Sequence, residues 1–234
     1  MSSATPAATV NHLLDAVPRT VLARLQSGLE RVELTYGQVL YEPQARITHV
    51  YFPLDCLVSL LTVVDDRKPL EVGMVGNEGM VGTAMVLGVD ESGVRALVQG
   101  SGSALRMSAA RFRAEFKASA PLQRAVYRYT HLLMAQVSQT AACNRFHTVD
   151  ARLGRWLLMT ADRMHTDQFQ LTQEFLAHML GVRRVGVTVA AGMLQSSGLI
   201  RYHRGEMTVL DRPGLEAAAC SCYAADCRAR AEAA

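Results

Sequence analysis

Four arginines gather in one interval near the C-terminal end of the sequence, and they are its clearest candidates for chemistry. No acidic residue occurs between Glu174 and Glu206, yet this interval contains Arg183, Arg184, Arg201 and Arg204. The whole chain of 234 residues has 24 basic and 21 acidic residues, a formal net charge of +3. A general polycation is therefore excluded, and a local basic patch that can contact nucleic-acid phosphates is indicated.

The arginines fall on a segment whose spacing is typical of a helix-turn-helix motif. Thr172 can cap a first helix that carries the small Ala177, and Gly181 can adopt the positive φ of the sharp turn that follows. A second helix is predicted beyond this turn, and its inward positions are filled by Val182, Val187 and Leu194. The alternative interpretation is a helical hairpin with a solvated pair of arginines.

A β-hairpin is predicted directly after the second helix, and it helps to decide between a helix-turn-helix and a plain helical hairpin. Residues 199–203 and 207–210 are strand-like and flank the turn Arg204-Gly205-Glu206. A helix-turn-helix followed by such a wing is the winged-helix pattern of DNA-binding domains. The sequence therefore favours a winged helix over a plain helical hairpin.

The pattern of apolar runs and turn residues in the N-terminal half is typical of an all-β region. Between Leu29 and Met107, short apolar runs such as 57–64 alternate with turn signals, Asp65-Asp66 among them. This spacing indicates a sandwich, jelly roll or barrel. Before it, residues 1 to about 12 form a predicted frayed tail, and Pro18 divides the next apolar segment into two short helices.

A long helix is predicted between the two halves. Pro121 favours a helix start, and residues 122–143 contain neither glycine nor proline. Apolar residues recur there at spacings of three and four, as in a helix that pairs with another helix: Val126, Tyr129, Leu133 and Val137. We expect these four residues to form a dimer seam; a core helix within one domain is the alternative.

Together these elements predict an α+β protein in three parts. Residues 1–120 form a jelly-roll-like β-roll domain with short N-terminal helices, 121–146 a dimerisation helix, and 147–234 a winged helix-turn-helix domain. Half of the residues are hydrophobic, so a sizeable core can be buried. No apolar run suits a membrane span and no signal sequence is visible, so we expect a cytoplasmic protein.

The whole arrangement resembles the Crp/Fnr family of bacterial transcription regulators. The most specific matches are LTQEFLAHMLGVRR at 171–184 and LQSSGLIRYHRGEMTVLDRPGLE at 194–216. VYFP and VGNEGMVG are similar, more loosely, to the cyclic-nucleotide-binding-like β-roll of that family. The resemblance covers residues 22–215 and implies a homodimer that reads a palindromic promoter and acts with RNA polymerase.

The resemblance also implies a DNA-contacting surface made by both helices and the wing: Thr172, Gln173, Arg183, Arg184, Val185, Thr188, Arg201, His203 and Arg204. Arg184 matches the first base-reading position of the family's recognition helix. Val185 and Val189 replace the glutamate and the later arginine that often follow it, so apolar contact with thymine methyl groups is what remains there. We therefore expect a sequence preference different from the family's best-known site.

The candidate effector pocket departs further from the family pattern. Gly82 fits its glycine-rich turn, but Thr83 stands where a ribose-binding glutamate is expected and Ser92 where a phosphate-binding arginine is expected. Arg95 lies three residues after Ser92. It is either a displaced substitute for the phosphate-binding arginine or a residue on the surface of a strand. Because no cation is directed at the position of the phosphate, we do not expect cyclic AMP to be the effector. The identity of the effector stays open.

The five cysteines fit reduced thiols better than a disulfide framework. Cys220, Cys222 and Cys227 form C-x-C-x4-C, whereas a zinc or iron–sulfur site usually needs four ligands. Cys56 and Cys143 belong to other elements, and the histidines, among them His147, show no paired metal spacing. We therefore expect free thiols on a terminal helix and neither a metal ion nor an iron–sulfur cluster.

No catalytic motif of the G-x-S-x-G, H-E-x-x-H or phosphate-loop type occurs, so an enzyme is not expected. The rival to a DNA-binding regulator is a small-molecule sensor whose helix-turn-helix contacts another protein. Salt dependence separates the two, because DNA binding releases counterions and weakens steeply with salt.

Overall fold

The N-terminal half of the chain folds into two antiparallel sheets that enclose an apolar core. The computed structural model describes residues 10–64 and 68–233, so most of the predicted tail and the predicted Asp65-Asp66 turn lie outside the described residues. One sheet has the order β1-β7-β3, with β1 (Glu30–Leu34), β7 (Gly102–Ser108) and β3 (His49–Pro53). The other has the order β2-β6-β4-β5, with β2 (Val39–Tyr41), β6 (Arg95–Gly100), β4 (Leu57–Val64) and β5 (Lys68–Val75).

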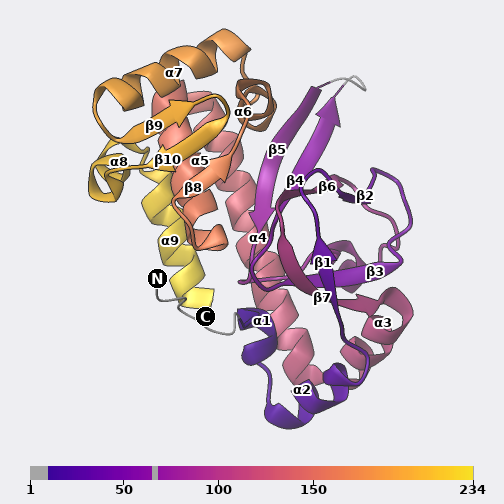
Figure 1. The fold of residues 1–234 in the computed structure, drawn as a ribbon. Helices are drawn as coiled ribbons and strands as arrows, with labels where there is room; N and C mark the ends of the chain where they lie inside the picture. The colour runs from indigo at the N-terminus through magenta and orange to yellow at the C-terminus, as the bar shows by residue number, and fades with distance from the viewer. Residues whose placement is uncertain (1–9, 65–67, 234) are drawn as a thin grey trace, which may run out of the picture.

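Short helices close the ends of this β-roll (Figure 1). Pro18 separates α1 (His12–Asp15) from α2 (Arg19–Gln26), as the sequence predicts. A 3-10 helix, η1 (Thr83–Leu87), and α3 (Ala109–Ala118) complete the domain. Phe52 and Phe112, which are almost fully buried, lie with their ring centroids 6.2 Å apart in the core.

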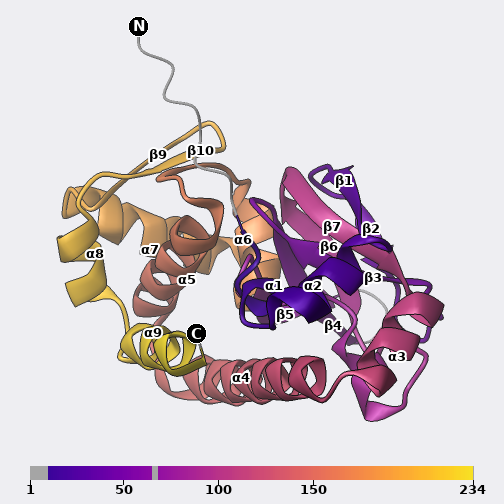
Figure 2. The same ribbon diagram turned by 90° about the horizontal axis from the view of Figure 1, so that it is seen from below.

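The long helix α4 (Ala120–Phe146) runs from the β-roll to the C-terminal half (Figures 1 and 2). Ser119 caps it, because its side chain accepts a hydrogen bond from the N–H of Leu122, and Pro121 occupies its first turn. The helix lies directly on the β-roll: a Cβ atom at Gly79 would come within 1.9 Å of the Tyr129 ring. Glycine at position 79 is therefore required for this contact.

The face of α4 that the sequence predicts as a dimer seam is largely turned into its own subunit. Val126 is 0% and Tyr129 5% exposed, and Leu133 is half-buried against Gly73. Only Val137 of the predicted four is exposed. That prediction is corrected here because the β-roll core takes up the first apolar stripe; the apolar residues left on the outer face are Tyr127, Met134 and Val137.

The C-terminal half is a winged helix-turn-helix unit, which confirms the predicted fold. After α5 (Val149–Met164) come β8 (Gln168–Gln170), α6 (Gln173–Leu180) and α7 (Arg184–Ser196). The hairpin β9 (Ile200–His203) and β10 (Glu206–Val209) pairs with β8 in the order β8-β10-β9, and α8 (Arg212–Ala218) and α9 (Cys222–Ala233) follow. Among the helices in the described ranges, none is both long and apolar enough to cross a membrane.

The two halves meet along the β4–β5 hairpin, which reaches α6 (Figure 1). Leu57, Leu61 and Met74 of this hairpin belong to the apolar core of the C-terminal half. Glu71 of β5 is buried there: its carboxylate accepts hydrogen bonds from the Trp156 indole at 2.9 Å and from the Ser59 hydroxyl at 2.6 Å. Burial outweighs these bonds and raises the pKa of Glu71 to about 7.

Glu71 should make the folded protein less stable as the pH rises from about 4.5 to 7. In this window the folded state keeps the Glu71 proton while the unfolded chain, with its ordinary pKa of 4.5, loses it. Glu71→Gln keeps the shape of the side chain but does not titrate. From pH 4.5 to pH 8 the free energy of unfolding of the parent should therefore fall by roughly 3 kcal/mol more than that of the variant. Urea unfolding at both pH values measures this difference. Glu33→Gln, at an exposed carboxylate on β1, is the matched control. Parallel curves for Glu71→Gln and the parent would contradict the assignment.

Candidate nucleic-acid interface

The turn between α6 and α7 has the geometry that the sequence predicts. The Thr172 hydroxyl accepts a hydrogen bond from the N–H of Phe175 at 3.1 Å and caps α6. Gly181 ends the helix in the left-handed region, at φ 62° and ψ 36°, and the N–H of Val182 bonds the carbonyl of Ala177 at 3.0 Å. Ala177 is buried, as close packing of the two helices requires.

The second helix, α7, has a buried inner face and an exposed outer face. Its inner side chains are buried in the C-terminal core: Val187, Ala190, Ala191 and Leu194. On the outer face Val185 is 68% and Val189 59% exposed, beside the exposed Arg184 and Thr188. Apolar side chains open to water at this position provide a surface that thymine methyl groups can contact.

Gln173, in the first turn of α6, holds the outer face of α7 in place. Its side-chain oxygen accepts hydrogen bonds from Nε of Arg184 at 3.3 Å and from the hydroxyl of Thr188 at 2.9 Å. The structure thus brings together three residues that the sequence analysis assigns to one surface. Arg183 and Arg184 sit at the N-terminus of α7, where the helix dipole also favours an anion.

The wing is a tight hairpin that is hydrogen-bonded to the segment before the first helix. Arg204 and Gly205 form its two-residue turn with φ of 49° and 86°, which is the type of turn that suits the twist of a hairpin. Arg201 and His203 alternate on β9 and are exposed. The Tyr202 hydroxyl donates to the carbonyl of Leu171 at 2.8 Å, which ties the wing to the segment directly before α6.

Tyr202 also places the wing next to the arginine of α7. Burial raises the pKa of the Tyr202 hydroxyl, and the positive charge of Arg184 acts in the opposite direction. The N–H of Tyr202 donates to the side chain of Gln195, at the end of α7, at 2.7 Å. Sequence reasoning did not single out Gln195 or Tyr202, because positioning residues of this kind carry no spacing signal of their own.

The four residues suggested for an effector pocket do not converge on a cavity. The space beside Gly82 is filled by Tyr41 and Val50, and Ser92 turns its hydroxyl to the carbonyl of Val94 at 2.7 Å. Thr83 is half-buried in η1. Nε of Arg95 pairs with the Glu42 carboxylate at 2.8 Å on the surface, so this arginine is engaged elsewhere.

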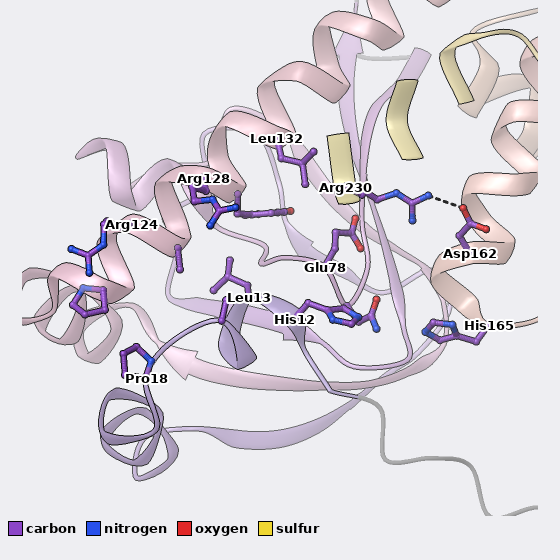
Figure 3. A pocket seen from close by; sticks show the side chains of 15 residues that line it. His12, Leu13, Pro18, Glu78, Arg124, Arg128, Leu132, Asp162, His165 and Arg230 are labelled. Carbon is purple, nitrogen blue, oxygen red and sulfur yellow. Dashed lines mark hydrogen bonds and ion pairs between the residues drawn. The ribbon is translucent and has the colours of Figure 1, made fainter. Parts of the chain in front are cut away.

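A cavity of about 510 Å³ lies at a different place, between α1, α4, α5 and α9 (Figure 3). Its walls carry basic side chains, which include His12, Arg124 and Arg230, together with the acidic Glu78 and Asp162. Figure 3 shows Arg230 reaching across to Asp162, with which it forms an ion pair at 2.7 Å. None of the four suggested pocket residues lines this cavity.

The cysteines are distributed differently from the sequence expectation. Cys143, at the end of α4, lies with Cys220 and Cys222 in a small buried cluster, whereas Cys227 lies outside it. His147 joins this cluster as the residue that caps α4. Cys143 and His147 are four positions apart at the C-terminal end of α4, and this spacing is the one sequence signal that could have indicated the pair.

Comparisons with known proteins agree with this geometry. The family model of the Crp-like helix-turn-helix domain matches residues 151–218. A search of curated proteins finds no match. Among solved structures, a protein from Eubacterium rectale described as a Crp/Fnr-family regulator is similar with a TM-score of 0.70 and 17% identity, over 88% of this chain and 96% of that one.

Two further solved structures have the same architecture. The c-di-GMP responsive global regulator CLP from Xanthomonas campestris is similar with a TM-score of 0.68 and 17% identity, over 83% of this chain and 100% of that one. A Crp/Fnr-family regulator from Thermus thermophilus has a TM-score of 0.68 and 21% identity, over 81% of this chain and 98% of that one. Residues 151–218 are therefore a Crp-like helix-turn-helix domain, and the chain as a whole has the fold of Crp/Fnr transcriptional regulators.

Proposed function

We propose that the protein is a transcription regulator that binds double-stranded DNA as a homodimer. The observation that carries this proposal is the set of exposed side chains at the N-terminus of α7 and on the wing. It includes four arginines, Arg183, Arg184, Arg201 and Arg204, and the described chain places no acidic residue between Glu174 and Glu206. A surface of this shape and charge suits the major groove and its flanking phosphates.

The residues of this surface take different roles. Arg184 is near the start of α7 and is held by Gln173, so it is positioned to donate to a guanine edge. Val185 and Val189 contact thymine methyl groups from the same face. Arg201, His203 and Arg204, on the wing, contact phosphates and give affinity rather than sequence preference.

The dimer forms through the outer face of α4. Tyr127, Met134 and Val137 are exposed there, and Met134 is 62% exposed, an unusual position for a large apolar side chain in an isolated helix face. Ala141 and Ser138 continue the same side with small residues that allow a second helix to approach. Two recognition helices related by a two-fold axis then read two half-sites of a palindrome.

An effector of this regulator binds in the cavity between α1, α4, α5 and α9 rather than in the β-roll. The cavity touches both the dimer helix and the DNA-binding unit, so occupancy there can favour one arrangement of the two over another. Asp162 is paired with Arg230 and Glu78 with Arg163, so the acidic side chains of the lining are compensated. Arg124 and His12 therefore suit an anionic small molecule. In the β-roll, Tyr41 and Val50 lie directly against Gly82, the glycine that matches the family's nucleotide-binding turn.

Substitution of single arginines should separate base contact from phosphate contact. Arg184→Ala should cost about 1–3 kcal/mol on the preferred site and relax the preference at one base pair. Arg204→Ala should weaken all DNA sequences alike and reduce the salt slope by about one. Titration of DNA selected from genomic fragments, at several salt concentrations, measures both effects.

The control for these variants is Arg19→Ala, at an exposed arginine of α2 in the β-roll domain. It should leave DNA binding unchanged. Binding to DNA that is insensitive to salt, or equal losses from Arg184→Ala and Arg204→Ala on every sequence, would instead favour a helix-turn-helix that contacts a protein.

Met134→Glu should convert the dimer to monomers and abolish binding to a palindromic site. The substitution places two like charges in an apolar contact, where neither has a partner. Met134→Leu, which keeps the volume and the apolar character, is the matched control and should remain a dimer. Light scattering gives the mass; a dimeric Met134→Glu protein would show that the subunits meet elsewhere.

Cyclic AMP and cyclic GMP should not change the DNA affinity. Arg95 is paired with Glu42, and the Ser92 hydroxyl is bonded within its own loop. Among the four suggested pocket residues, Arg95 is the only cation that could meet the phosphate. Calorimetry with each nucleotide, together with DNA titrations in its presence, tests this expectation. Micromolar binding with a tenfold or larger gain in DNA affinity would overturn it.

A further inference from the structure

Four potential metal ligands converge at the point where α4 ends. The side chains of Cys143, His147, Cys220 and Cys222 each offer one ligand atom, and these four atoms all lie within 4.8 Å of one another. Cys143 and Cys222 are 1% exposed and Cys220 is 7% exposed. Ligands that are 77 positions apart in the sequence thus share one small buried volume.

Two of the six separations between these atoms match the spacing around a single tetrahedral ion, and the others are no longer than 4.8 Å. Sγ of Cys143 and Sγ of Cys220 are 3.5 Å apart, and Sγ of Cys222 is 3.5 Å from Nδ1 of His147. A zinc ion with Zn–S bonds of about 2.3 Å and Zn–N bonds of about 2.0–2.1 Å separates its ligand atoms by roughly 3.5–3.8 Å. Three sulfurs and one imidazole nitrogen are a donor set that favours zinc.

Separate hydrogen bonds hold the different ligand residues of the cluster in place. The N–H of His147 donates to the carbonyl of Cys143 at 3.2 Å, which ends α4 and sets both ligands on one face. The N–H of Cys220 donates to the carbonyl of Ala151 in α5 at 3.3 Å. The Gln139 amide donates to Sγ of Cys222 at 2.9 Å, the kind of outer-shell hydrogen bond that orients a thiolate ligand.

The charge of the surroundings also suits a thiolate-bound zinc ion. Three thiolates, a neutral imidazole and a divalent ion carry a single net negative charge. Arg152 and Arg155 of α5 are buried, at 7% and 6% exposure, and both interact electrostatically with Cys143. Within the described residues neither arginine has a carboxylate ion-pair partner, so the single negative charge of the metal centre would compensate part of their positive charge.

The geometry points to a structural zinc site formed by Cys143, His147, Cys220 and Cys222. Four protein ligands leave no open position, so the ion has a structural and not a catalytic role. It joins the C-terminal end of α4 to the segment between α8 and α9, and the whole winged helix lies in the loop between its two pairs of ligands. The expectation of free thiols on a terminal helix is replaced by this proposal, which does not depend on DNA binding.

The experiment measures zinc in the full-length chain purified under reducing conditions. We expect one zinc ion per chain by elemental analysis, and tetrahedral cobalt(II) bands with thiolate charge transfer after exchange for cobalt. Cys222→Ser and His147→Ala should each weaken zinc binding by more than the roughly 10–100-fold expected from loss of an outer-shell partner, and Gln139→Ala should fall within that range. Circular dichroism reports whether each variant folds.

Cys227→Ser is the matched control, because this cysteine lies in the same helix as Cys222, α9, but is not one of the four ligands. It should keep the full zinc content and the cobalt spectrum. The cobalt spectrum of the parent protein decides the case even if a ligand variant does not fold. A reduced parent protein that takes up no zinc or cobalt, or a Cys143–Cys220 disulfide found in its place by peptide mass spectrometry, would overturn the proposal.

Discussion

The buried positive charge of Arg163 is the constraint on which the meeting of the two halves depends. This side chain of α5 is 1% exposed, and its Nε lies 2.8 Å from the Glu78 carboxylate of the β-roll, while Nη2 lies 3.7 Å from Asp226 of α9. A guanidinium out of water costs several kcal/mol unless anions compensate it. The loop at Glu78 is shaped for this contact, because a Cβ atom at Gly76 would come within 2.8 Å of the arginine. One charge therefore fixes α5, the β-roll loop and the last helix relative to one another.

The junction around Arg163 is specific because it combines this charge with polar and aromatic contacts. Trp156 donates its indole N–H to Glu71, and Phe175 of α6 lies with its ring centroid 5.9 Å from that of Tyr36 in the β-roll. A buried ion pair adds little net stability but strongly disfavours arrangements in which it is broken. The helix α6 lies between the β-roll and α7 (Figures 1 and 2), so this docking leaves the outer face of α7 exposed.

The sequence predicts those parts of the fold that depend on local periodicity and turn chemistry. Gly181 at the helix end, Thr172 as the helix cap and the Arg204-Gly205 turn adopt the conformations that local cap and turn chemistry favours. The face of α4 used for packing was not predictable in the same way, because apolar residues occur around most of that helix. Which stripe is buried depends on the β-roll, whose contact at Gly79 is a tertiary feature. The ion pair of Arg95 was not predictable from the sequence for the same reason, because its partner Glu42 is 53 positions away.

The proposed zinc site and the proposed dimer helix act on the same element, and this has a mechanical consequence. The winged helix is attached to α4 at its start, through the short connection at His147, and again at its end, because α9 packs back along α4. A unit held at one point can rotate about its connection, whereas a unit held at two points must follow the helix that carries it. Closing the loop with a metal ion also removes conformational freedom that a free C-terminal segment would retain. The distance between two recognition helices is then set by how two α4 helices pack, so any ligand that changes that packing changes the half-site spacing that the protein can read.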